Sequence, residues 1–300
     1  MSISAYLKEI GRGRDGARAL TREQAADLMG QVLDQTVSDL EIGAFCLAMR
    51  IKGETAHEMA GFLDAAHVRL QKIKVAPSVP CVVLPSYNGA RKLPVLTPLL
   101  AHLLAREGLA VVMHGTPTEN ARITSQEVLQ AMHHPAFDRT REVQAGDVVF
   151  VPTEQLCPGL RQLLDVRRVV GLRNPAHSLV KLMNPCHASA LLISSYTHPE
   201  YAVSMADTLA LTHTRAILLR GTEGEAVADP RRQPQIDAFI QGQRTSLLPA
   251  QAGSLTHLPD LPAIDAAATA EFIQSVLHGD APVPASLAAQ VQAVLRALAM

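Results

Sequence analysis

Residues 81–113, with the sequence CVVLPSYNGARKLPVLTPLLAHLLAREGLAVVM, decide the fold of this 300-residue chain. The stretch begins with the aliphatic run 81–84 and continues through a turn-like segment at 86–89. A helical segment then starts at Thr97, and the proline after it costs no hydrogen bond at a helix start. A second aliphatic run follows at 109–113. This order of strand, turn, helix and strand predicts a βαβ unit of a parallel sheet.

Three further aliphatic runs extend the predicted sheet, at 147–151, 191–194 and 216–219. They lack the polar alternation of half-exposed strands, as is typical of parallel strands that are covered on both faces. A last amphipathic helix is predicted at 286–298.

The first 75 residues predict helices only. Thr21, Ser38 and Thr55 are each followed three positions later by Glu or Gln, which is the capping-box pattern of a helix start. Short connections predict that these helices are antiparallel neighbours. The apolar and basic segment 160–183 is also helical in pattern, and we expect it to pack back on the first helices.

An α/β protein with two domains follows from this order of elements. We expect a small all-helical domain from residues 1–75 plus about 160–187. A larger mixed α/β domain is expected from residues 76–159 plus 188–300.

Composition excludes several classes of protein. Hydrophobic residues make up 48% of the chain and charged residues 18%, which excludes a disordered protein. Only six Phe, four Tyr and no Trp are present, so a surface of stacked aromatic rings is not expected. The four cysteines have no CxxC spacing, which excludes a zinc ribbon and favours reduced thiols. No signal-peptide pattern and no membrane-spanning run is found, so we expect a cytoplasmic protein without a membrane partner.

Charge is unevenly distributed, although the formal net charge is only −1. Segment 161–187 carries five Lys or Arg residues and one acidic residue, whereas 188–300 carries six Arg and ten acidic residues. Clustered positive charge attracts phosphates. A solvated helix face, whose arginine stems cover apolar surface, explains the same run equally well.

Several motifs, in order, resemble the anthranilate phosphoribosyltransferase family and its nucleoside-phosphorylase relatives. They are GLRNPAHSLVKLMNP at 171–185, YTHPEY at 196–201 and RGTEG at 220–224. The segments YNGARK at 87–92 and LTPLL at 96–100 resemble a divergent branch of the family that binds nucleic acid with little sequence preference. The resemblance covers nearly the whole chain. It implies a cleft at the hinge between the two domains and a homodimer joined through the helical domain.

The enzymes of this family hold phosphoribosyl pyrophosphate and magnesium on the α/β side of the cleft. Their Gly-Thr-Gly-Gly-Asp loop lets backbone N–H groups approach the pyrophosphate closely. Here the loop is YNGAR at 87–91, and its Cβ atoms stand where the backbone must be bare. We therefore expect no pyrophosphate cradle, but a loop that contacts a phosphodiester backbone. An ordinary turn with basic surface residues is the alternative.

Other family motifs are altered as well. The Asn-x-Ser-Thr motif is PVLT here, and its remaining Thr97 is also explained by a helix-cap role. The Lys-His-Gly-Asn motif has lost its lysine to Met113 but keeps His114 and Gly115. Ala226 and its neighbour stand where the enzymes place an Asp-Glu pair that binds magnesium.

We therefore predict a degenerate, phosphoribosyltransferase-like homodimer that binds single- or double-stranded nucleic acid through a basic groove. No catalytic residue, metal ligand or cofactor is expected. The predicted phosphate contacts are Asn88, Gly89, Arg91, Lys92, Arg167, Arg168, Arg173 and Lys181. The further candidates for cleft residues are Thr97, His114, Gly115, His177, His198 and Glu223.

Two alternatives stay open. One is an active glycosyl- or phosphoribosyltransferase that uses phosphoribosyl pyrophosphate and magnesium, with Glu223 and Glu225 as metal ligands on a shifted loop. The other is a small-molecule sensor that has kept the cleft for a nucleotide.

Overall fold

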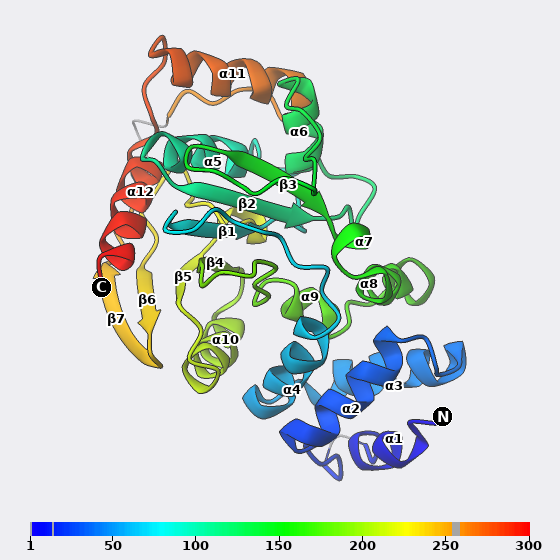
Figure 1. Cartoon of the computed structure of the whole chain (residues 1–300). Coiled ribbons are helices and arrows are strands. Elements are labelled where there is room, and N and C mark those ends of the chain that lie inside the picture. The colour runs from blue at the N-terminus through cyan, green and yellow to red at the C-terminus, as the bar shows by residue number, and fades with distance from the viewer. Residues whose placement is uncertain (1, 14, 254–258) are drawn as a thin grey trace.

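A computed structural model describes residues 2–13, 15–253 and 259–300. It contains a small helical bundle beside a larger mixed α/β domain (Figure 1). The bundle begins with α1 (Ser4–Ile10), α2 (Arg22–Leu33), α3 (Asp39–Lys52) and α4 (Ala56–His67). Capping boxes form at all three predicted helix starts. The expectation of antiparallel neighbours is wrong for consecutive helices, because α2 packs mainly on α4 and α3 contacts α1 and α8.

The predicted return of segment 160–183 to the bundle is confirmed. Helix α8 (Pro158–Val170) contacts α2 and α3, and α9 (Ala176–Leu179) contacts α4. The chain thus leaves the sheet after β3 (Val148–Pro152), completes the bundle and returns to the sheet.

Within the described residues the sheet has seven strands, in the order β3-β2-β1-β4-β5-β6-β7. Its parallel part adds β1 (Cys81–Pro85), β2 (Ala110–Gly115), β4 (Leu191–Tyr196) and β5 (Ala216–Arg220) to β3. The five predicted strands are thereby confirmed. An antiparallel hairpin, β6 (Ile236–Ile240) and β7 (Gln243–Leu248), extends one edge and was not predicted.

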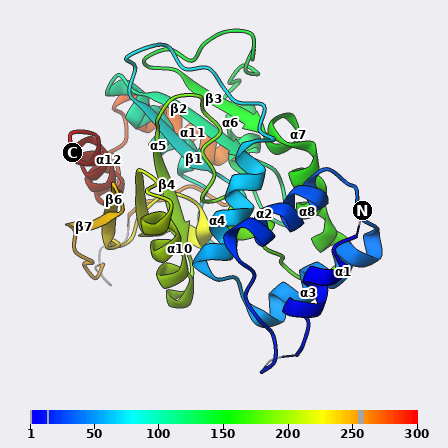
Figure 2. The ribbon, with the colours of Figure 1, turned by 60° about the horizontal axis from the view of Figure 1, so that its bottom comes forward.

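Successive side chains of each strand point to opposite faces of the sheet, and both faces are covered. Val83, Val112 and Leu192 point to the face that packs against the bundle, α8 and α10 (Pro199–Leu211). Val82 and Leu84 pack on the other side, against the layer formed by α5 (Thr97–Arg106), α11 (Ala266–His278) and α12 (Ala285–Leu298). Figure 2 shows the bundle to one side of the sheet and α12 at its far end. Short helices α6 (Ser125–Ala131), α7 (Thr153–Leu156) and the 3₁₀ turn η1 (Thr222–Gly224) complete the chain.

The position of β1 determines where ligands are expected. It lies between β2 and β4. From β1 the chain adds β2 and β3 on one side of the sheet, and it later adds β4 and β5 on the other side. Open α/β sheets bind ligands at such a switch point, outside the carboxyl ends of the strands. Here that edge carries the loop after β1 and the turn after β5, and it lies next to the bundle. In the described part of the chain, no helix is long and apolar enough to cross a membrane.

Candidate functional site

Glu225 holds the loop after β1, which we call the β1 loop (residues 86–93). Its Oε1 accepts hydrogen bonds from the backbone N–H groups of Asn88 and Gly89, both at 2.9 Å. Its Oε2 accepts from the hydroxyls of Ser86, at 2.5 Å, and Thr97, at 3.0 Å. The Glu225 side chain is buried, and four donors surround its carboxylate. This is the donor pattern that holds a phosphate group.

Glu223 occupies the other half of the β1 loop. Its Oε1 accepts from the backbone N–H groups of Arg91, Lys92 and Leu93 at 3.2, 2.8 and 3.1 Å. Arg122 lies 3.5 Å from Oε2 of the same carboxylate. The β1 loop therefore keeps a cradle of N–H donors, contrary to the expectation from its sequence, but the chain's own carboxylates fill it.

The residues present do not fit phosphoribosyl pyrophosphate with magnesium. The loop donors already have acceptors, and Ala226 and Val227 are buried apolar residues at the position of the family's acid pair. Both glutamate carboxylates point into the loop and accept hydrogen bonds from its backbone N–H groups. Within the described residues, no group of three His, Cys, Asp or Glu side chains is arranged to hold a metal.

Thr97 and Lys181 both donate hydrogen bonds to the segment that contains Glu223 and Glu225. Leu96, not Thr97, caps α5, and the Thr97 hydroxyl bonds Glu225 instead, so the predicted helix-cap role is wrong. Lys181 donates from Nζ to the carbonyl oxygen of Gly224 at 2.8 Å. Burial lowers the pKa of Lys181 to about 8, although Glu225 opposes that shift.

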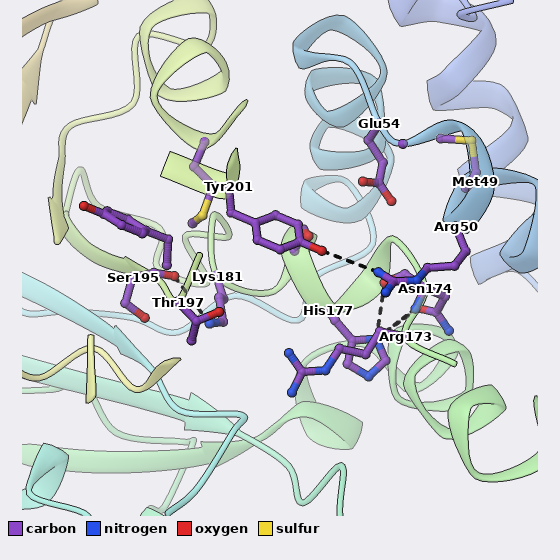
Figure 3. Close-up of a pocket in the computed structure, with 14 residues that line it drawn as sticks. Met49, Arg50, Glu54, Arg173, Asn174, His177, Lys181, Ser195, Thr197 and Tyr201 are labelled. Atoms are coloured by element: carbon purple, nitrogen blue, oxygen red, sulfur yellow. Dashed lines mark hydrogen bonds between the residues drawn. The ribbon is translucent and has the colours of Figure 1, made fainter. Parts of the chain in front are cut away.

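A pocket of about 150 Å³ lies between the bundle and the carboxyl ends of the strands, and we call it the cleft pocket. Figure 3 shows Arg50 and Glu54 reaching it from the bundle, opposite Tyr201. The Tyr201 hydroxyl lies 3.4 Å from Nη1 of Arg50. Arg173, His177 and Lys181 line it too, so three of the predicted residues meet here.

Burial shapes the electrostatics of the cleft pocket. It lowers the pKa of His177 to about 3, an effect that Arg173 reinforces, so the imidazole is neutral at pH 7. Nε2 of His177 is buried and has no partner among the described residues. Burial also lowers the pKa of Arg173, with Arg167 adding to the effect. The pocket thus combines Arg and Lys charge with an unused polar atom.

A larger pocket of about 680 Å³ continues along the sheet edge, and we call it the edge pocket. Four Lys or Arg residues and two acidic residues line it, together with His198. The basic residues are Lys92, Arg220, Arg231 and Arg232. Tyr196 and Thr197 line both pockets, so the two adjoin past the end of β4, and we call them together the groove.

Arg167 and Arg168 lie outside both pockets, and carboxylates engage them. Arg167 pairs with Glu119, and Arg168 lies 3.0 Å from Asp165. Burial alone would raise the pKa of Glu119, but hydrogen bonds from Arg122 and Arg167 lower it to about 2. Much of the positive charge predicted for segment 161–187 is therefore neutralised within the protein.

His114 and Gly115 stand at the end of β2, where they are fully packed. Nδ1 of His114 lies 2.8 Å from the Tyr87 hydroxyl, and burial lowers the pKa of this histidine to about 3. A Cβ on Gly115 would meet the Ser86 carbonyl oxygen at 1.8 Å, so this glycine lets β1 and β2 approach closely. Neither residue lines the groove.

Sequence reasoning missed several groove residues. Arg50, Glu54 and Arg231 belong to no motif, and only the tertiary fold brings them together. Arg220 begins the RGTEG motif, but the motif did not assign it to the groove.

Comparisons with known proteins agree with this architecture. Residues 4–67 match the glycosyl transferase family, helical bundle domain. The chain is 38% identical to the uncharacterized protein YbiB of Escherichia coli K12, over 98% of this chain and 94% of that protein. It is 26% identical to an anthranilate phosphoribosyltransferase of Exiguobacterium sibiricum, over 92% and 83% of the two chains.

Solved structures show the same fold. Anthranilate phosphoribosyltransferase from Thermus thermophilus superimposes with a TM-score of 0.72 at 21% identity, covering 95% of this chain and 85% of that one. The Saccharomyces cerevisiae enzyme in complex with PRPP and Mg gives 0.72 at 14% identity, covering 98% and 86%. The small helical domain and mixed α/β domain expected from the sequence are confirmed. The chain therefore belongs to one family with YbiB, and its first helices match the helical bundle domain of the glycosyl transferase family.

Proposed function

We propose that this protein binds the phosphate backbone of nucleic acid in the groove formed by the cleft pocket and the edge pocket. The observation that carries the proposal is the charge state of that groove. Three Lys or Arg residues and one acidic residue line the cleft pocket, and four basic and two acidic residues line the edge pocket. A groove in which basic residues outnumber acidic ones can bind the phosphates of a polyanion along its length.

The pairing of these charges supports the proposal. Both acidic residues of the edge pocket are already engaged, Glu223 by the β1 loop and Asp229 by Arg231 at 2.9 Å. Arg50, Lys92 and Arg220 are exposed and form no ion pair with any described residue. Their charges are therefore available to an external anion.

Arg50→Ala and Arg220→Ala test the assignment by fluorescence anisotropy on two oligonucleotides of unrelated sequence. Arg296→Ala, an exposed arginine near the end of α12, is the matched control. Backbone contacts do not discriminate between sequences, so both groove variants are expected to weaken both oligonucleotides equally. Unchanged affinity in both groove variants contradicts the groove assignment, and loss on one sequence alone indicates base recognition.

Transfer of a phosphoribosyl group is a second candidate function, favoured by relatives named anthranilate phosphoribosyltransferase that match over most of the chain. The filled β1 loop counts against it, because electrostatic stabilisation of the leaving group is missing and one such contribution is worth ~10²–10³ in rate. The assay is the decay of anthranilate fluorescence with phosphoribosyl pyrophosphate and magnesium. Turnover that Glu223→Gln/Glu225→Gln abolishes establishes the transferase, and absence of turnover favours the binding protein.

The proposed partner set includes a second copy of this chain. Leu40, Leu47 and Ile51 are exposed along α3, and Val169 and Leu172 are exposed at the end of α8. Val169 lines an apolar pocket of about 400 Å³ between α3 and α8, and Leu47 and Ile51 line another of about 340 Å³ between α1 and α3. An apolar face of this extent on a charged protein favours an interface between helical domains.

A further inference from the structure

We propose that Glu223 and Glu225 act as a built-in occupant of the phosphate loop, which closes this member of the family to diphosphate ligands. The inference concerns small anions at the β1 loop and goes beyond the binding of a polymer in the groove. It identifies two specificity-determining residues that act by intramolecular competition.

The first support is the completeness of the contact. Five consecutive or nearly consecutive backbone N–H groups of the β1 loop, at residues 88, 89, 91, 92 and 93, donate to these two carboxylates. Two hydroxyls, from Ser86 and Thr97, complete the set. Hydrogen bonds to ionised acceptors are about twice as strong as neutral ones. A phosphate entering the loop has to displace carboxylates that already use its donors.

The second support is the way the turn is held in place from behind. Lys181 and the Ser195 hydroxyl both donate to the Gly224 carbonyl oxygen at 2.8 Å. Asn88 Nδ2 donates to the Glu223 carbonyl oxygen, also at 2.8 Å. Gly224 has φ +90°, and a Cβ there would meet Asn88 Nδ2 at 1.9 Å, so only glycine permits this approach. These contacts fix the turn with its carboxylates directed into the loop.

The third support is the backbone of Glu223 itself. This residue has φ 52° and ψ 19°, a left-handed conformation that is unfavourable for a side chain with a Cβ. Its carboxylate accepts hydrogen bonds from three backbone N–H groups, and these bonds compensate for that conformation. The fold therefore maintains this contact. Because the two carboxylates belong to the same chain as the β1 loop, they are always present beside its donors.

Sodium pyrophosphate without magnesium is the probe, and isothermal titration and the thermal midpoint are the readouts. Wild type is compared with Glu223→Ala/Glu225→Ala in which both carboxylates are removed, and with Glu223→Ala alone. Sodium sulfate at matched ionic strength controls for general anion effects. Glu271→Ala, at an exposed position of α11, controls for the loss of one carboxylate elsewhere.

The double variant is expected to bind pyrophosphate at least about tenfold more tightly than wild type, because several charge-assisted hydrogen bonds become available. Its thermal midpoint is expected to fall and then to recover as pyrophosphate is added, whereas the response of wild type to pyrophosphate is expected not to exceed its response to sulfate. Glu223 is partly exposed, so the single variant is expected to fold even where the double variant does not, and to gain pyrophosphate affinity on its own.

Wild type that binds pyrophosphate as tightly as the variants overturns the inference, and so does a folded single variant without any gain. Oligonucleotide affinity is measured on wild type alone, because Glu223 lines the edge pocket. Its presence or absence there bears on the groove alone, so failure of this inference and failure of the proposed function are distinguished.

Discussion

The backbone N–H of Gly89 donates to Oε1 of Glu225 over 2.9 Å, across 136 positions of sequence. This contact joins the loop that follows β1 to the turn that follows β5. At the carboxyl edge of the sheet, where open α/β sheets bind ligands, this contact occupies a donor of the β1 loop with a side chain of the same protein. The remaining positive charge lies along the groove beside it.

Replacing Glu225 by alanine is expected to destabilise the protein more than the same change at Glu223. Glu225 is buried, and its loss leaves two N–H groups and the Thr97 hydroxyl without an acceptor, whereas the Ser86 hydroxyl still reaches Oγ of Ser125 at 2.8 Å. Buried unsatisfied donors cost ~1–3 kcal/mol each when water does not reach them, and we expect a total of about 3 kcal/mol. Urea unfolding measures the difference. Equal losses for the two variants contradict the structural role of Glu225.

Arg167→Ala is expected to lower stability without lowering oligonucleotide affinity. Arg167 pairs with Glu119, and the two side chains are 19% and 23% exposed, so we expect a loss of about 1 kcal/mol at pH 7. The folded pKa of Glu119, about 2, lies below its ordinary value. The stabilisation is therefore present above about pH 4.5 and disappears as the pH falls toward 2. An affinity loss as large as that of Arg50→Ala contradicts this division of roles.

Stability is expected to fall between pH 7 and pH 4 because of buried histidines. Burial lowers the folded pKa of His114 and of His177 to about 3. The unfolded chain, with ordinary histidine pKa values near ~6.5, binds more protons in this interval, so acid favours unfolding. His114→Asn should reduce the slope of unfolding free energy against pH, whereas His57→Asn, at an exposed site, should leave it unchanged. Equal slopes in all three proteins count against this explanation.

Charge on the apolar face of the bundle is expected to produce monomers. Leu40→Glu and Val169→Glu place a carboxylate on side chains that are 84% and 89% exposed in the single chain. Burying an unpaired charge in an interface is unfavourable, so both variants should elute as monomers while wild type elutes as a dimer. Val203→Glu, on exposed α10, is the matched control. Light scattering coupled to gel filtration decides, and a monomeric wild type contradicts the interface.

The sequence alone predicted those helices and strands whose position depends on a local pattern of residues. The aliphatic runs of β1 and β2 and the proline at the start of α5 placed the βαβ unit, and three capping boxes placed the helix starts. The hairpin was missed because β7 begins Gln-Arg-Thr-Ser and is exposed over these residues, so it lacks the apolar alternation that indicates a strand.

The site was predictable only in part. Lys92, Arg173 and Lys181 were named from motifs and do line the groove. Pairing between Arg167 and Glu119 depends on how α8 packs beside the loop after β2, and no local pattern encodes that distance. The same holds for Glu223 and Glu225, since the β1 loop meets them only through the strand order of the sheet.

The salt dependence of oligonucleotide binding tests the central claim most directly. For a groove that contacts phosphates, log affinity falls linearly with log salt by ~0.7–0.9 per contact. Arg50→Ala/Lys92→Ala/Arg220→Ala should bind more weakly, with a slope reduced by ~1 per lost contact, while Arg296→Ala keeps the wild-type slope. Affinity that does not change with salt, or a triple variant with the wild-type slope and affinity, would contradict nucleic-acid binding in this groove.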